Sequence, residues 1–125
     1  KTFFVKPQTY MNRSGDAVAE IAKFYKVHVE KDLLVVHDEI DLKFGFWKFV
    51  FDSRPAGHNG VKSIIEQLGT QQFHRIRIGA ESRKSKLESP TDEYVLSPFS
   101  QDELIALQQT IFPEVRKSIE QFILG

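Results

Sequence analysis

The clearest structural signal in the sequence is a run of apolar residues from Leu33 to Val36. A continuous apolar run is typical of a β-strand that is covered on both faces. The run leads into an acidic segment, residues 37–41, which contains Asp38. Ligands of open α/β sheets bind beyond the carboxyl ends of the strands. Asp38 is therefore a candidate for orienting a catalytic histidine or carrying charge, and the alternative is a turn-forming role in a solvated acidic cluster.

Residues 55–63 combine two glycines and a His58–Asn59 pair with the start of a helical pattern. The apolar residues that recur with helical spacing are Val61, Ile64, Ile65 and Leu68. His58 and Asn59 therefore lie at or just before a helix N-terminus, where free N–H groups and the helix dipole favour anions and carbonyl oxygens. The alternative is a plain loop in which Asn59 caps the helix.

Similar patterns predict the other elements of the chain. Strands are expected at 2–5, 33–36, 46–51 and 73–79, and helices at 15–26, 61–68 and 101–122. Ser14 is the expected N-cap of the first helix, and Pro113 predicts a break or kink in the last one near 109–113. Asn12 lies in the approach to the first helix, where a turn role is the alternative to ligand binding. Aromatic residues of the 46–51 strand are expected in the core, with base stacking as the alternative.

The charge balance limits how this chain binds nucleic acid. The 17 basic and 17 acidic residues give a formal net charge of zero, so any RNA contact must come from a local patch. One candidate is Arg75 with Arg77 on one strand face, and another is the basic segment 83–86. The sequence has no cysteine, no apolar run long enough to cross a membrane and no visible signal peptide.

Several segments together resemble a known family. They are residues 6–15 (KPQTYMNRSG), 33–42 (LLVVHDEIDL), 56–63 (AGHNGVKS), 68–70 (LGT) and 73–79 (FHRIRIG). In this order they look like the bacterial-type peptidyl-tRNA hydrolase, over nearly the whole chain. The resemblance implies a single α/β domain with a twisted, mostly parallel, mixed sheet flanked by helices. It also implies hydrolysis of the ester that joins a peptide to tRNA, which recycles tRNA from stalled translation, with no metal and no cofactor.

The resemblance also implies roles for individual residues. Those that match substrate or tRNA contacts are Tyr10, Asn12, His58, Asn59 and Arg77. Asp38 matches the acid that holds the catalytic histidine in its basic form. The set suits ester hydrolysis. A positioned base increases the reaction rate roughly 10²–10⁴-fold, and one oxyanion donor increases it roughly 10²–10³-fold.

Some positions depart from the family pattern. The family opens with a strand, a Gly-Asn-Pro-Gly turn and a Thr-Arg-His-Asn segment with the catalytic histidine, and residues 1–125 contain none of these. We therefore expect one peptidyl-tRNA hydrolase-like domain, 1–125, that lacks its N-terminal strand and helix and is inactive alone. His37 and His58 are not obvious substitutes, because the family keeps similar histidines beside its catalytic one. Val50 stands where the family often has a second phosphate-binding lysine, and Arg54 is the candidate replacement.

The competing hypothesis is a non-catalytic RNA-binding relative of the same fold, of the organellar splicing-factor type. The same asparagines and arginines would then form an RNA surface. The expected partner is peptidyl-tRNA, with no membrane, and the expected protein is a monomer in the cytoplasm, or in an organelle if the source is eukaryotic. A histidine in the upstream motif would favour the enzyme, and another residue there would favour the RNA-binding protein.

Overall fold

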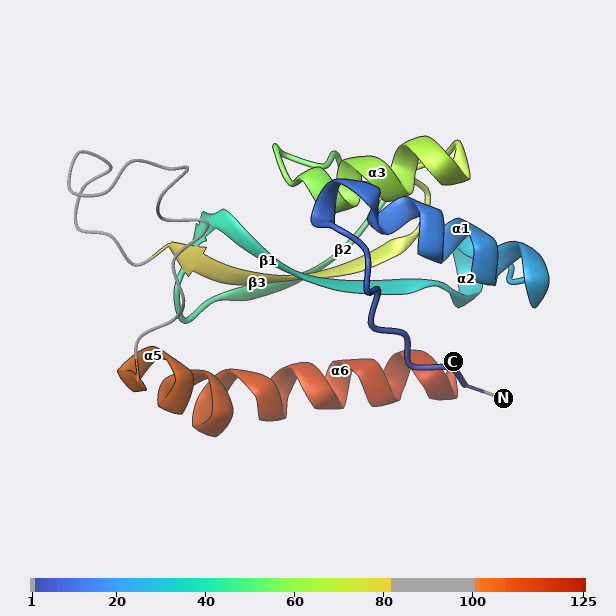
Figure 1. Ribbon diagram of the computed structural model, residues 1–125. Coiled ribbons are helices and arrows are strands. Elements are labelled where there is room, and N and C mark those ends of the chain that lie inside the picture. Colours follow the sequence, from blue (N-terminus) through green and yellow to red (C-terminus); the bar gives the residue numbers. More distant parts are fainter. Residues whose placement is uncertain (1, 82–100) are drawn as a thin grey trace. The chain divides into compact units, whose positions relative to one another are not determined.

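The structure is a computed structural model, which describes residues 2–81 and 101–125 (Figure 1). Its strands are β1 (Leu34–Lys43), β2 (Trp47–Phe51) and β3 (His74–Glu81), hydrogen-bonded in the order β1-β3-β2. The strand that comes last in the sequence therefore lies between the two earlier ones. This mixed sheet with helices confirms the predicted α/β class.

The helices fall into an early and a late group. The early group comprises the 3₁₀ turn η1 (Met11–Arg13), α1 (Ser14–Phe24), α2 (Val29–Asp32) and α3 (Asn59–Leu68). The late group comprises α5 (Gln101–Ala106), the π-helical segment η2 (Leu107–Ile111) and α6 (Phe112–Leu124). None of the helices within 2–81 and 101–125 is long and apolar enough to cross a membrane.

Contacts divide the chain into two compact units. The first consists of Lys1–Val35 and Phe49–Arg75, and the second of Val36–Lys48 and Ile76–Gly125. Each strand has residues in both units, while the early helices belong to the first unit and the late helices to the second.

The first unit is built on the packing of α1 against α3, which run side by side in Figure 1. Gly15 of α1 lies directly against α3, because a Cβ atom there would overlap the Ser63 carbonyl oxygen. The Gly15 N–H donates to the Ser63 hydroxyl oxygen at 2.9 Å, and this bond is buried. The apolar core of this unit includes Ala22, Val61, Ile64 and Phe73. A glycine and a serine at facing positions therefore set how closely the two helices approach.

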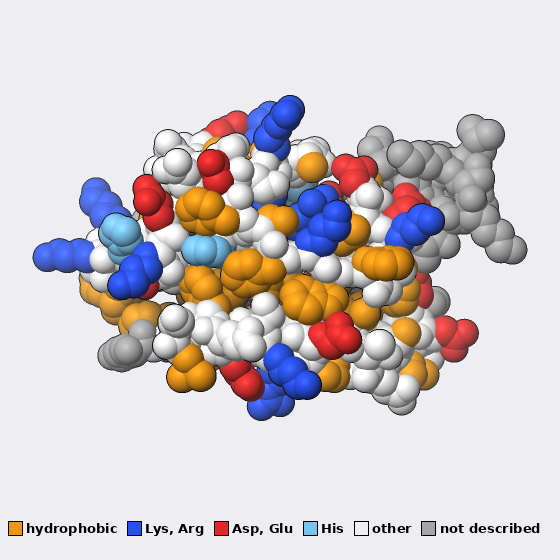
Figure 2. Space-filling model, turned by 180° about the vertical axis from the view of Figure 1, so that it is seen from behind, with side chains coloured by type: hydrophobic (Ala, Val, Ile, Leu, Met, Phe, Trp, Pro, Cys, Tyr) orange, Lys and Arg blue, Asp and Glu red, His pale blue; other side chains and the backbone are white. Residues whose placement is uncertain are grey.

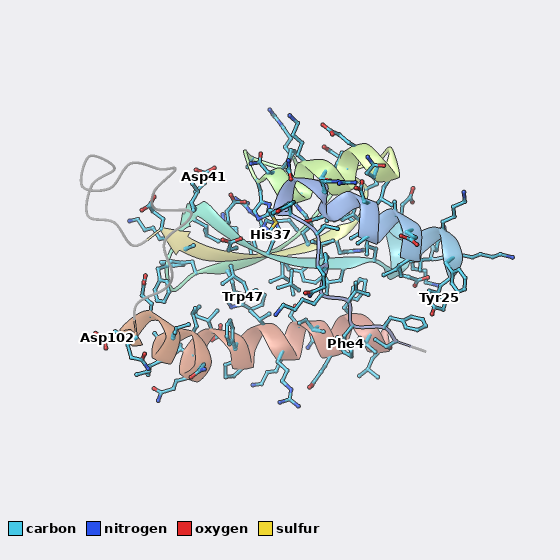
Figure 3. All side chains as sticks on the ribbon, in the orientation of Figure 1. Phe4, Tyr25, His37, Asp41, Trp47 and Asp102 are labelled. Atoms are coloured by element: carbon cyan, nitrogen blue, oxygen red, sulfur yellow. The ribbon has the colours of Figure 1, made fainter. Side chains whose placement is uncertain are left out.

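The second unit contains the interrupted C-terminal helix. Pro113 lies in the first turn of α6, directly after η2, so the predicted irregularity near 109–113 is confirmed as a π-helical segment. A period of 3.6 residues places Leu104, Leu107, Ile111 and Val115 on one inward face of this helix. The last three are buried, but Leu104 is 40% exposed. The wider π turn shifts the helix phase, so an inward face extrapolated at 3.6 residues per turn fails across it. Trp47 of β2 donates its indole N–H to Glu114 at 2.7 Å (Figure 3).

Three local predictions are wrong. Residues 2–5 form no strand, and Phe4 is 82% exposed. A strand needs a neighbour to pair with, which side-chain type alone does not supply. The strand predicted at 33–36 continues to Lys43, so Asp38 lies within β1 and not beyond its end.

The aromatic residues around β2 are the third correction. Phe46, Phe49 and Phe51 are 60%, 41% and 47% exposed, and the surface in Figure 2 displays hydrophobic side chains. Phe49 and Phe51 both lie near the His74 ring, with centroids 5.5 and 4.7 Å away. These aromatics are therefore not core residues. The helix predicted at 61–68 is confirmed, and its C-cap Gly69 adopts the left-handed conformation that favours glycine.

Candidate functional site

The segment with Tyr10 and Asn12 is folded into a tight turn. The Tyr10 carbonyl accepts from the Arg13 N–H at 2.8 Å, which closes η1. The buried Ser14 hydroxyl donates to the Met11 carbonyl, also at 2.8 Å. These bonds fix the backbone on both sides of Asn12, so its position follows from the position of the turn.

This turn packs on the first turn of α3. A Cβ atom on Gly60 would lie 2.5 Å from the Met11 sulfur and 3.0 Å from the His58 ring. Such separations are below van der Waals contact, so a side chain at position 60 would push Met11 away. The absent side chain of Gly60 therefore lets η1 sit on the helix start that carries His58 and Asn59.

The cap of α3 is His58, so the alternative interpretation in which Asn59 caps the helix is wrong. The His58 backbone is extended, at φ −77° and ψ 111°, and its Nδ1 accepts from the Val61 N–H at 3.2 Å. The imidazole nitrogen thus supplies an acceptor for one of the N–H groups at the helix start that have no partner within the helix. Asn59 is the first residue of the helix and is exposed.

Both asparagines keep their side-chain amides available. Asn12 and Asn59 are exposed, and neither side chain makes a hydrogen bond within the described part of the chain. The N-cap of α1 is Arg13, without a side-chain cap bond, and Ser14, the predicted cap, is already helical. Capping therefore does not explain either asparagine, and η1 packed on α3 brings their two elements together.

An open hollow adjoins the turn. It has a volume of about 500 Å³ and is lined by Gln8, Thr9, Tyr10 and Arg13. This volume lies within the usual range of ligand sites, roughly 300–1,000 Å³. The Tyr10 ring is 84% exposed beside it. The first unit thus offers an exposed aromatic ring and unused amide donors in one region.

The second unit holds the acidic candidate, Asp38. Side chains alternate along β1, with His37 and Glu39 buried and Asp38 exposed between them. His37 Nδ1 lies 2.8 Å from the Asp38 carbonyl oxygen, and Figure 3 labels His37 on this strand. The Asp38 carboxylate therefore projects from the opposite face of the strand to the His37 ring. Its role in orienting a histidine remains a prediction.

Arg77 has a buried anionic partner. Its Nε lies 3.1 Å from a Glu39 carboxylate oxygen, and the two side chains are 19% and 2% exposed. Glu39 is thus a functional candidate that the sequence interpretation missed, although the period-2 alternation of a strand placed it on the buried face with His37. Arg77 keeps two terminal nitrogens for another anion, so its contact with phosphate remains a prediction.

Arg75 does not fulfil the expected exposed phosphate clamp. It is 2% exposed and donates to the Arg54 carbonyl at 2.7 Å. Because Arg75 is buried, its side chain cannot contact RNA at the surface of the first unit. The Arg54 side chain is exposed, and its proposed replacement of a phosphate-binding lysine stays a prediction.

Two features lie outside the described residues. One is the basic segment 83–86, and the other is Ser100, which begins residues 100–103 (SQDE), a pattern typical of a helix capping box. Within 2–81 and 101–125 there is no group of three or more metal-ligating side chains.

Solved structures with a similar fold give the first identification. A peptidyl-tRNA hydrolase from Acinetobacter baumannii is 29% identical with a TM-score of 0.67, covering 93% of this chain and 63% of that one. A peptidyl-tRNA hydrolase in complex with N-propanol is 34% identical with a TM-score of 0.67, covering 78% of this chain and 48% of that one. The chain therefore has the fold of these hydrolases.

The family follows from the sequence comparisons. The Peptidyl-tRNA hydrolase family model matches residues 1–125, so the chain belongs to that family. The peptidyl-tRNA hydrolase of Staphylococcus aureus strain JH9 is 42% identical over 123 residues, which are 98% of this chain and 63% of the relative. The chain thus spans less than two thirds of the length of this relative.

Proposed function

We propose that this chain contributes to hydrolysis of the ester between peptide and tRNA in peptidyl-tRNA. The observation that carries the proposal is the packing of η1 on the start of α3, which brings together the elements of Asn12 and Asn59. Both amides are exposed and unused, so they are free to bind an ester. Family membership supports the ester between peptide and tRNA as that substrate.

The two amides suit the charge that develops during ester hydrolysis. Attack of water on the ester carbonyl creates an oxyanion, and a neutral N–H donor stabilises it without holding a counter-charge in the resting site. Each well-placed donor increases the rate of the chemical step roughly 10²–10³-fold. The exposed Tyr10 ring is suited to stacking on a base near the 3′ end of the tRNA.

We assign Asp38 the role of orienting a histidine that acts as the general base. Three of the four histidines already make contacts within the protein. His58 caps α3, His37 contacts a backbone carbonyl, and His74 lies near two phenylalanine rings. His28 precedes α2 and matches none of the family motifs. We therefore propose that residues 1–125 alone have little or no turnover.

The test compares two proteins on N-blocked aminoacyl-tRNA. One is the 125-residue chain, and the other, the extended protein, is the same chain preceded by a segment with the family's opening strand, Gly-Asn-Pro-Gly turn and Thr-Arg-His-Asn motif. Hydrolysis by the extended protein alone is the expected result. The matched control is the extended protein with the histidine of its Thr-Arg-His-Asn segment replaced by alanine.

Each other outcome has a definite meaning. Equal turnover by both proteins would assign the base to His37 or His58. Binding of tRNA by the extended protein without hydrolysis would instead identify a non-catalytic RNA-binding member of the family.

The partner and the site of action follow from the same proposal. Peptidyl-tRNA is the expected partner, and Arg77 is the expected phosphate contact of the second unit through its terminal nitrogens. The proposed protein acts as a monomer in the cytoplasm, where translation supplies this substrate.

A further inference from the structure

Met11 is the only sulfur-containing residue of the chain, which has one methionine and no cysteine. It lies between Tyr10 and Asn12 in the candidate site and is 58% exposed. A small oxidant in solvent therefore has access to this residue. Within residues 1–125, oxygen transfer to sulfur can therefore happen only at this position, next to the site.

The Met11 sulfur lies in a confined environment on its α3 side. Since even a Cβ atom on Gly60 would lie 2.5 Å from the sulfur, no atom fits between them. On another side the Ser14 hydroxyl oxygen lies 3.6 Å from the sulfur. That hydroxyl already donates to the Met11 carbonyl at 2.8 Å and thereby supports η1.

We propose that Met11 is an oxidative modification site whose conversion to the sulfoxide displaces η1 from α3 and switches the site off. The inference deepens the proposed function and rests on it, because the switched property is the use of peptidyl-tRNA. The oxidant class is a hydroperoxide, and the modification is reversible by a methionine sulfoxide reductase.

The chemistry balances with these reactants. The peroxide O–O bond breaks and one oxygen forms a bond to the thioether sulfur. The remainder leaves as water from hydrogen peroxide, or as an alcohol from an organic hydroperoxide, so sulfur loses two electrons and the peroxide gains them. In the reverse reaction, the reductase removes the oxygen as water while a dithiol becomes a disulfide. The chain has no cysteine, so this dithiol comes from the reductase system.

A new oxygen on either of the two protein-facing sides of the sulfur disturbs the turn. An oxygen directed at Gly60 has no space, so the thioether must leave α3. An oxygen directed at Ser14 is a strong acceptor that competes for the hydroxyl proton now given to the Met11 carbonyl. The sulfoxide is also polar, which weakens the packing that an apolar thioether provides. Either way the backbone of Asn12 loses its fixed position relative to α3.

The experiment treats the extended protein with hydrogen peroxide and compares it with its Met11→Leu variant. Leucine has a similar volume, so it preserves the packing, and it has no sulfur to oxidise. Mass spectrometry first confirms the gain of one oxygen atom. The kcat/KM on N-blocked aminoacyl-tRNA should then fall by at least about 10-fold, because a displacement of about 1 Å in a site lowers the reaction rate by up to roughly 100-fold. Peroxide should leave the kcat/KM of the variant at the level of the untreated variant, and a reductase with dithiol should restore the oxidised wild type.

A second measurement reports on the turn itself and needs no activity. Hydrogen exchange of the Gly15 and Arg13 N–H groups in the 125-residue chain should accelerate after oxidation in the wild type and stay constant in the Met11→Leu variant. Full activity of the sulfoxide form, equal inactivation of the variant or unchanged exchange would overturn the inference. An untreated extended protein without turnover would count against the proposed function alone, and the exchange measurement would still decide whether oxidation moves the turn.

Discussion

The ion pair between Arg77 and Glu39 makes Arg77 a structural residue as well as a candidate tRNA contact. Glu39 is 2% exposed, so removal of the guanidinium leaves a buried carboxylate without its cation. Breaking a buried pair in this way costs about 3–5 kcal/mol. Because Arg77 itself is 19% exposed, water partly replaces it, and we expect the lower end of this range, about 3 kcal/mol, for Arg77→Ala.

This loss of free energy of unfolding corresponds to a measurable decrease in Tm. The entropy of unfolding is about 2.1 cal/mol/K per residue, or roughly 0.26 kcal/mol/K for 125 residues. The Tm of Arg77→Ala should therefore fall by roughly 11 °C in thermal unfolding followed by circular dichroism. The matched control is Arg116→Ala, whose pair with Glu120 is 81% and 58% exposed and should contribute less than about 1 kcal/mol.

A second variant separates stability from tRNA binding. The double variant Arg77→Ala with Glu39→Gln lacks both charges of the pair, so no carboxylate is left buried without its cation. Its Tm should therefore lie above that of Arg77→Ala. Both variants lack the cation, so the slope of log affinity for tRNA against log salt should become shallower by roughly 0.7–0.9 if one phosphate contact is lost. A Tm within about 2 °C of wild type for Arg77→Ala would refute the ion-pair argument, since this shift corresponds to only about 0.5 kcal/mol.

Three further predictions concern the site. In the extended protein, Asp38→Asn should lower kcat by at least about 100-fold with KM nearly unchanged, because an orienting carboxylate acts on the chemical step, while Asp41→Asn on the same strand should leave kcat intact. Asn12→Asp and Asn59→Asp should each lower kcat/KM by at least about 10-fold, since negative charge replaces an oxyanion donor. Early melting with normal turnover would assign these asparagines a structural role. Ser63→Ala should lower the free energy of unfolding by about 1–3 kcal/mol, measured by urea denaturation, because a buried backbone N–H loses its acceptor.

Local pattern was sufficient for the regular elements of the chain. The spacing of Val61, Ile64 and Leu68 predicted α3, because amphipathic periodicity is a property of a few neighbouring residues. Pro113 likewise predicted the interruption that the structure shows as η2 and the start of α6. These features depend on contacts only a few residues apart.

Family motifs extended the prediction to the candidate site. Tyr10, Asn12, Asn59 and Asp38 were selected by the motifs that contain them, and the family match over residues 1–125 supports the motifs. Local reasoning still misjudged their surroundings. It ended a strand before Asp38 when β1 continues to Lys43, and it did not identify His58 as the cap of α3.

The sequence by itself therefore determined the types of element, most of their positions and the family. Only the tertiary structure decided that Gly15 and Ser63 lock α1 to α3, that Gly60 makes room for Met11, and that Glu39 is buried as the partner of Arg77. Each of these contacts joins residues that are far apart in the chain, and each depends on the fit of atoms or on burial. Side-chain periodicity indicates which face of an element is buried, but the partner on that face is chosen by packing in three dimensions.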